Sequence, residues 1–196
     1  MPVTNEQLSS MVEEYRSHRP DWERQIAFYT NIEDFAELLD KAGRAVEENE
    51  RKCKHQRRQQ RDDLLACSER LLARQSEFEQ AENFEQIHQL VIACTRDIFK
   101  AAWLYWYDTT LRISVNRKIY PEKVYLQAGA KKGGLALLGR DAVAQYRCRN
   151  TGIIALPKKC FPEPLQCLEP YQIEDFLCGY AEDLVRWSQE SSATLC

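Results

Sequence analysis

The stretch FEQIHQLVIACTRDIFKAAWLYWYDTTLRIS, residues Phe84 to Ser114, determines how the rest of the chain can fold. It contains neither Pro nor Gly, and its apolar residues recur at steps of three and four, which is the spacing of one buried helix face. Between Ile98 and Tyr107 nearly every residue is apolar, so we expect other helices to cover this part on several sides. The sequence therefore predicts a central helix over 84–114.

Charged residues within this stretch argue against a membrane span. A span needs about 20 consecutive apolar residues, and this run is interrupted by Arg96, Asp97, Lys100 and Asp108. The first three of these also mark where any chemistry on this helix would have to take place.

Length and charge indicate one domain without a strong electrostatic preference. The 196 residues suffice for one sizeable core, and we expect residues 1–196 to form a single α-helical domain. The formal charge is −3, with 27 Lys or Arg against 30 Asp or Glu, so net charge predicts neither a nucleic-acid nor a membrane partner. Any charged partner must be predicted from local clusters.

The N-terminal residues and the cysteines predict a cytoplasmic or nuclear protein. MPVTNEQLSS carries neither the basic lead nor the apolar run of a signal peptide. The eight cysteines contain no C-x-x-C pair and no His at a zinc-ligand spacing, so we expect reduced thiols with mostly structural roles.

Two further segments show the spacing of long helices. One follows Pro20, which suits the first turn of a helix because that turn does not use the missing N–H, and its apolar stripe reaches Leu39. The other follows Pro170 and contains Gly179, which costs about 1 kcal/mol relative to Ala inside a helix. No segment shows a useful β alternation, so the sequence predicts an all-α fold, a helical bundle of long antiparallel helices.

Residues 116–170 predict a long loop-rich insert before the last helix. Pro and Gly gather there, and we expect only a short helix, between Gly134 and Tyr146. The motif AGAKKGG, residues 128–134, lacks both the spacing of a phosphate-binding loop and a preceding strand, so we interpret it as a flexible basic loop. A loop of this length is either functional or partly disordered.

The densest positive cluster of the chain lies between residues 51 and 61. Its members, called the basic segment below, are Arg51, Lys52, Lys54, Arg57, Arg58 and Arg61, with His55 among them. A helix carrying these side chains would attract the phosphates of RNA or DNA. The alternative is a solvated helix face, which is favoured by the acids that flank the cluster between residues 47 and 50 and at 62 and 63.

Three stretches together resemble the translin family, and within it the Trax (translin-associated factor X) branch. They are PDWERQIAFYTNIEDFAELL from Pro20, IHQLVIACTRDIFKAAWLYWYDTTLRIS from Ile87 and IEDFLCGYAEDLVRW from Ile173, in the family's order and internal spacing. The resemblance implies a helical bundle that assembles, as a hetero- or homo-oligomer with translin-like subunits, into a closed shell. Such shells bind single-stranded RNA or DNA.

The resemblance also implies a metal-dependent endoribonuclease in which acids from two helices hold the metal. Mg²⁺ prefers oxygen ligands, and carboxylates three or four residues apart share a helix face, so two facing helices can hold a metal that activates water. The matching positions here are Asp97 and Lys100 in the central stretch, and Glu182 and Arg186 in the last one. Cations thus replace two of the four acids.

These replacements weaken the expected site. Four carboxylates need a metal for neutralisation, whereas two acids and two cations on neighbouring helices neutralise one another. The attraction between two opposite charges 4 Å apart is roughly 4 kcal/mol at an effective dielectric near 20. We therefore expect absent or weakened nuclease activity, in which Asp97 and Glu182 could still act as catalytic residues and hold Mg²⁺ loosely. The alternative is that Glu182 and Arg186 form a surface pair worth a few tenths of a kcal/mol.

Three functions remain open at this point. The first is a single-stranded RNA- or DNA-binding subunit of a translin–Trax-type assembly, and the second is an active metal-dependent ribonuclease that uses Asp97 and Glu182. The third is a helical protein–protein interaction subunit without a nucleic-acid ligand. Family members continue with further helices beyond the position of Cys196. Either this member is shortened and a partner covers its apolar face, or the match is to a different helical protein.

Overall fold

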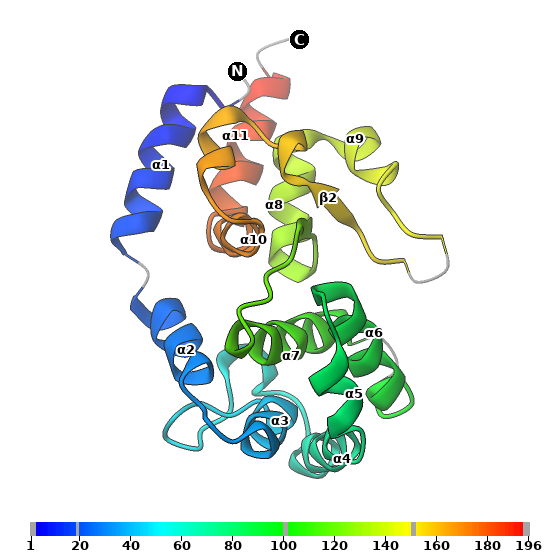
Figure 1. Cartoon of the computed structure of the whole chain (residues 1–196). Helices are drawn as coiled ribbons and strands as arrows, with labels where there is room; N and C mark the ends of the chain where they lie inside the picture. The colour runs from blue at the N-terminus through cyan, green and yellow to red at the C-terminus, as the bar shows by residue number, and fades with distance from the viewer. Residues whose placement is uncertain (1–2, 19, 100–101, 150–151, 194–196) are drawn as a thin grey trace. The chain divides into compact units, whose positions relative to one another are not determined.

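The chain folds as two compact units. A computed structural model describes all residues except 1–2, 19, 100–101, 150–151 and 194–196. Unit 1 comprises residues 1–19 and 122–196, and unit 2 comprises residues 20–121. The described residues are mostly helical, which confirms the predicted fold class (Figure 1). Where the sequence suggests one domain over 1–196, the backbone contacts separate two.

Among its described residues, unit 2 has helices and one isolated β-bridge, between Val46 and Lys52, but no strand. α7 packs against α2, α3 and α6, and every residue from Tyr105 to Val115 is buried, so α7 is the central helix of this unit. The elements of unit 2 are α2 (Pro20–Thr30), α3 (Phe35–Arg44), the 3₁₀ helix η1 (Lys54–Gln56), α4 (Arg61–Leu72), α5 (Gln75–Gln80), α6 (Phe84–Thr95) and α7 (Trp103–Asn116).

The stretch from Phe84 to Ser114 forms two helices rather than the single helix that its period predicts. α6 ends at Thr95 and α7 begins at Trp103. A continuous helix of this length would extend about 46 Å at 1.5 Å per residue, too long for both of its apolar halves to be buried in one small unit. Because the chain reverses, α6 packs against α7, and the rings of Phe84 and Tyr107 lie 5.9 Å apart.

The segment after Pro20 is also divided, into α2 and α3. Asp34 begins the second helix, since its side chain accepts a hydrogen bond from the N–H of Ala36 (2.9 Å). The end of α2 is held by Asn116 of α7, whose amide donates to the carbonyl oxygens of Tyr29 (3.0 Å) and Ile32 (2.8 Å). The apolar stripe of the sequence therefore belongs to two helices that share one core.

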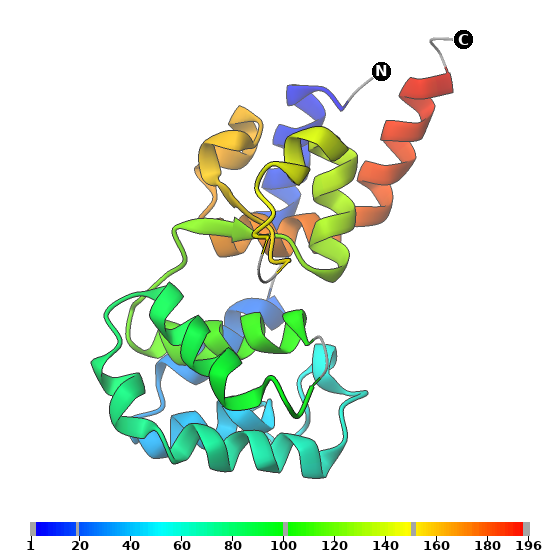
Figure 2. The same cartoon turned by 90° about the vertical axis from the view of Figure 1, so that its right-hand side faces the viewer.

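Unit 1 combines helices with a two-stranded antiparallel sheet, in which Lys123 lies opposite Pro157. α8 packs against α10 and α11, and α1 packs against η3 (Figures 1 and 2). The segment after Pro170 is divided at Tyr180, so Gly179 ends a helix instead of lying within one. The elements of unit 1 are α1 (Asn5–Ser17), β1 (Lys123–Tyr125), α8 (Ala128–Leu138), α9 (Arg140–Ala144), β2 (Ala155–Pro157), η2 (Lys158–Cys160), η3 (Glu163–Cys167), α10 (Pro170–Gly179) and α11 (Ala181–Ala193).

The predicted insert over 116–170 contains far more regular structure than its composition suggests. The motif AGAKKGG forms the first two turns of α8, not a flexible loop. A Cβ on Gly133 would overlap the carbonyl oxygen of Leu177 in α10, and a Cβ on Gly129 would lie 2.7 Å from Sγ of Cys178. These glycines therefore allow α8 to approach the backbone of α10, which is a packing role that a single sequence does not reveal.

The described part of the chain has no helix that is both long and apolar enough to cross a bilayer. The seven described cysteines are free thiols, of which Cys53, Cys67 and Cys94 are buried.

Replacing Gly133 by Ala should lower the free energy of unfolding by about 2 kcal/mol, because the new methyl group forces α8 away from α10. Urea denaturation followed by far-UV circular dichroism measures the loss. Lys131→Ala is the matched control, since Lys131 is exposed on the same helix and should change stability by less than about 0.5 kcal/mol. Equal stability of the two variants would contradict the packing role.

Acidification should destabilise the protein through His88, which is buried on α6 with 3% of its surface exposed. Burial lowers the pKa of His88 from 6.5 to about 4, so the unfolded chain takes up the proton first. The contribution of neutral His88 to the free energy of unfolding is then fully present above pH 6.5. It is lost as the pH falls toward about 4, by roughly 3 kcal/mol in total. Urea titrations at several pH values, comparing wild type with His88→Gln, test this: the difference between the two should shrink or reverse on acidification, and a constant difference would refute it.

Candidate nucleic-acid interface

The basic segment lies in the connection between α3 and α4, not on one helix as the sequence suggests. α3 ends because Ala45 adopts a left-handed backbone conformation (φ 52°), and only the three residues of η1 are helical before Arg61 begins α4. Five cations of the segment are exposed, and none of them forms an ion pair within the described residues: Arg51, Lys54, Arg57, Arg58 and Arg61. Four of these cations therefore lie on the connection of residues 45–60, and Arg61 is the first residue of α4.

Two other residues of this connection point inward. Cys53 is buried, its N–H donates to the carbonyl oxygen of Ala45 (2.7 Å), and its Sγ accepts a hydrogen bond from Gln25 (3.3 Å). Gln56 is 1% exposed. The half-buried Lys52 is tied to the end of the connection, because its Nζ donates to the carbonyl oxygen of Gln59 (2.7 Å).

The inward side of η1 is bound by a charged pair on α7. Gln56 donates through Nε2 to Asp108 (2.8 Å) and accepts through Oε1 from Nη2 of Arg112 (2.9 Å). His55 Nδ1 lies 3.1 Å from the same Asp108 oxygen. Asp108 and Arg112 occupy successive turns of α7, with 3.8 Å between Oδ2 and Nη2. Two adjacent residues of the connection are thus attached to the central helix of unit 2.

Arg112 is 4% exposed, so this pair lies inside the protein. Its guanidinium also lies 5.8 Å from the ring of Tyr29, whose hydroxyl donates to the carbonyl oxygen of Val46 (2.6 Å) just before the basic segment. Removing one partner of a buried pair leaves an uncompensated charge, which usually destabilises a protein by 3–5 kcal/mol. Gln56, Asp108 and Arg112 together form what we call the anchor, and it depends on all three residues being present.

Glu50 does not neutralise the basic segment, although the sequence places it next to Arg51. Its carboxylate accepts hydrogen bonds from Lys41 (2.5 Å) and Arg44 (2.9 Å) of α3, and the Lys41 bond lowers the pKa of Glu50. Asp62 and Asp63 lie in the first turn of α4, where their negative charges interact favourably with the positive end of the helix dipole. These acids therefore have roles within the fold.

The structure pairs Asp97 and Glu182 with cations other than those that the sequence suggests. Asp97, in the turn after α6, accepts from Arg70 of α4 (2.5 Å), and this hydrogen bond lowers the pKa of Asp97. Glu182 of α11 accepts from Lys132 of α8 (2.5 Å). Both acids are exposed, and they belong to different units.

The remaining members of the expected acidic site do not complete it. Arg186 pairs with Asp183 (2.6 Å) and not with Glu182, and Lys100 lies outside the described residues. Among the residues that the structure describes, no three His, Cys, Asp or Glu side chains form a group that could hold a metal ion. Helix spacing showed which positions share a face, but it could not show which residue of another helix lies opposite. The Mg²⁺ site therefore stays a prediction.

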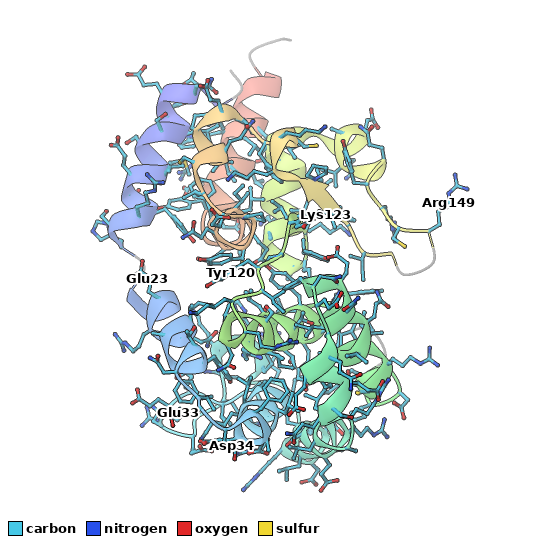
Figure 3. All side chains as sticks on the ribbon, in the orientation of Figure 1. Glu23, Glu33, Asp34, Tyr120, Lys123 and Arg149 are labelled. Atoms are coloured by element: carbon cyan, nitrogen blue, oxygen red, sulfur yellow. The ribbon has the colours of Figure 1, made fainter. Side chains whose placement is uncertain are left out.

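Unit 2 also has a shallow depression of about 650 Å³ beside the junction of α2 and α3. Phe28 and Ile32 are among its apolar lining residues. Four acids line it as well, of which two are labelled in Figure 3: Glu33, Asp34, Glu37 and Glu48. Because these acids repel phosphate, the depression does not extend the surface of the basic segment.

Sequence reasoning found the exposed cations but missed Gln56 and Arg112 as their support. The one available signal was the Asp108–Arg112 pair at a spacing of four within the most apolar part of the central stretch. Charges of opposite sign at that spacing on a buried helix indicate an internal ion pair. Its contact with Gln56 joins positions 56 residues apart, which local patterns do not show.

Arg112→Met should lower the free energy of unfolding by about 3 kcal/mol or more, because it leaves Asp108 buried without its counter-ion. It should also release the basic segment, so that trypsin cleaves there faster than in the wild type, as mass spectrometry of the fragments would show. Asp97→Asn is the control, since it removes only the exposed pair with Arg70 and should change neither measurement appreciably. Unchanged cleavage in Arg112→Met would mean that the anchor does not hold the segment.

Comparison of the chain with family models, with curated proteins and with solved structures finds no match in any of the three. The resemblance to the translin family therefore stays a prediction from the three quoted stretches.

Proposed function

We propose that this protein binds single-stranded RNA or DNA through the basic segment of unit 2. The observation that carries the proposal is a set of exposed cations that form no ion pair within the described residues. The backbone that carries them is attached to α7 through Gln56. Lys and Arg side chains that neutralise phosphates release condensed counterions, which favours binding in a salt-dependent way. A fixed connection reduces the ordering entropy that binding would otherwise cost.

The composition and shape of the segment favour a single strand. Four of its six cations are Arg, whose planar guanidinium donates two parallel hydrogen bonds to a phosphate. All of the cations except Arg61 come from an irregular connection and not from a long helix of the kind that enters the major groove of a duplex. A flexible single strand can adjust its phosphates to such a surface.

The proposal is binding, with RNA cleavage absent or weak. Asp97 and Glu182 are each paired with a cation of their own unit, which opposes their use as metal ligands. Cleavage of a labelled strand in the presence of Mg²⁺ that is lost in Asp97→Asn would support nuclease activity. In that case the ion pair between Asp97 and Arg70 would have to break before Asp97 could bind a metal.

A second candidate function is assembly with a protein partner, including a translin-like subunit. The depression beside α2 and α3 favours it, because its lining of apolar residues and four acids, against the single cation Arg24, can accept a cationic side chain of another protein. Light scattering of the purified chain, alone and with added nucleic acid, distinguishes an assembly from a monomer.

Neutralising Arg57 and Arg58 together, as Arg57→Gln/Arg58→Gln, should weaken binding of a fluorescent single strand about tenfold at low salt. The negative slope of log K against log salt should become shallower by about 1.4, because each lost phosphate contact of a single strand contributes about −0.7. Fluorescence anisotropy at several salt concentrations measures both quantities. The control Arg96→Gln/Lys118→Gln removes the same charge from exposed positions elsewhere in unit 2.

A control that weakens binding as much as the test variant would show a general charge effect without a site. Failure of the wild type to bind any single strand at low salt would overturn the proposed function.

A further inference from the structure

Unit 1 carries its positive and negative charges in different parts of its sequence. Residues 123–159 contain eight Lys or Arg and a single acid, Asp141, for a net charge of +7. The remainder of unit 1 contains three Lys or Arg and eleven Asp or Glu, for a net charge of −8. The net charge of unit 1 is therefore small, although its positive and negative side chains are concentrated in different segments of the chain.

The positive part also forms one continuous part of the fold. The N–H of Leu126 donates to the carbonyl oxygen of Ile154 (2.9 Å), and the N–H of Cys148 donates to that of Ile153 (2.8 Å). Consecutive carbonyl groups of a strand point to opposite sides, so the strand containing β2 lies between β1 and the segment around Cys148. Figure 2 shows light-green β1 beside the yellow chain that leads into β2.

The segment around Cys148 and the strand that contains β2 pair as a hairpin, and one side-chain contact joins this hairpin to η2. Arg147 forms an isolated bridge with Ile154, and the hydroxyl of Tyr146 lies 3.2 Å from Sγ of Cys160. The side chain of Tyr146 therefore reaches the end of η2, which carries Lys158 and Lys159, while Arg147 and Arg149 follow along the strand that pairs with residues 153 and 154. The hairpin and η2 together present the cations that we call the basic rim: Arg147, Arg149, Lys158 and Lys159.

The basic rim is accessible, and the acids nearest to it in the sequence are the exposed Asp141 of α9 and Glu163 of η3. Arg147, Arg149 and Lys159 are exposed, Lys158 is half-buried, and none of the four forms an ion pair within the described residues. Figure 3 shows Arg149 extending away from unit 1. The acidic helix α1 lies on the opposite side of the unit from α9 and β2 (Figure 1). A polyanion can therefore approach the rim without meeting the acids of α1.

The rim offers charge without apolar side chains for insertion into a membrane. The exposed large apolar residues of the described chain are Leu65, Trp103 and Tyr120, and all of them lie outside 123–159. Stable attachment to a membrane surface usually combines cations with such side chains or with a lipid anchor. The chemistry of the rim fits a chain of phosphates in water.

We propose that the basic rim is a second phosphate-binding surface, so that each unit contributes one surface to the same single-stranded nucleic acid. This inference rests on the proposed function of the basic segment. Linked binding surfaces raise the apparent affinity for a ligand that reaches both, by a factor of roughly 10²–10⁴ over one surface. A strand that engages both surfaces must be longer than the site of either one.

The test uses the full chain and single strands of two lengths, about 8 and about 40 nucleotides, since one site of this kind covers about 4–16 nucleotides. Three variants remove two positive charges each: Arg147→Gln/Arg149→Gln in the rim, Arg57→Gln/Arg58→Gln in the basic segment, and Arg96→Gln/Lys118→Gln as control. Anisotropy gives the affinity and salt slope for each pair, and thermal unfolding checks that the exposed substitutions leave the fold intact. Vesicles of phosphatidylserine are measured in parallel.

We expect the wild type to bind the long strand at least about 10²-fold more tightly than the short one. The rim variant should lose at least about tenfold in affinity for the long strand, and its negative salt slope should become shallower by about 1.4. A rim variant that matches the control on both strands would overturn the second surface and leave the basic segment untouched.

The other outcomes are equally decisive. If the rim variant loses binding while the basic-segment variant matches the control, the rim binds phosphate but the proposed function of the basic segment is wrong. If the rim variant loses vesicle binding and keeps its affinity for both strands, the ligand of the rim is a lipid surface and the proposal fails.

Discussion

The buried contact between Gln56 and the Asp108–Arg112 pair is the constraint on which the arrangement of unit 2 around its basic segment depends. A carboxylate and a guanidinium removed from water each lose several kcal/mol of hydration unless they are paired. Here the amide of Gln56 joins both charges, so the connection between α3 and α4 is attached to the central helix. The exposed arginines are positioned by residues that lie inside the protein.

That attachment requires the reversal between α6 and α7. A continuous helix over 84–114 would have exposed one of its two apolar halves, whereas the folded-back pair buries Phe84 against Tyr107 and leaves α7 surrounded by α2, α3 and α6. In this position α7 can present Asp108 and Arg112 to η1. The hydrophobic effect thus determines where the polar anchor lies, because it places α7 at the centre of the unit.

Unit 1 shows the same division of roles between packing and charge. Gly129 and Gly133 allow α8 to approach α10 closely, which fixes the scaffold beneath the small sheet. The cations of the rim lie on the hairpin and on η2, where their side chains are exposed or half-buried. These cations lie at the surface because a buried cation would need a partner, whereas an exposed one is stabilised by water.

The amino-acid sequence by itself determined the helical class, the buried face of α7 and the presence of a dense cluster of cations, because these are properties of local period and composition. Only the tertiary structure decided where helices end, that AGAKKGG packs as a helix, and that Arg70 and Lys132 are the partners of Asp97 and Glu182. The physical reason is that helix ends and ion-pair partners depend on contacts between residues far apart in the chain. The same period and the same charges are compatible with many such sets of contacts.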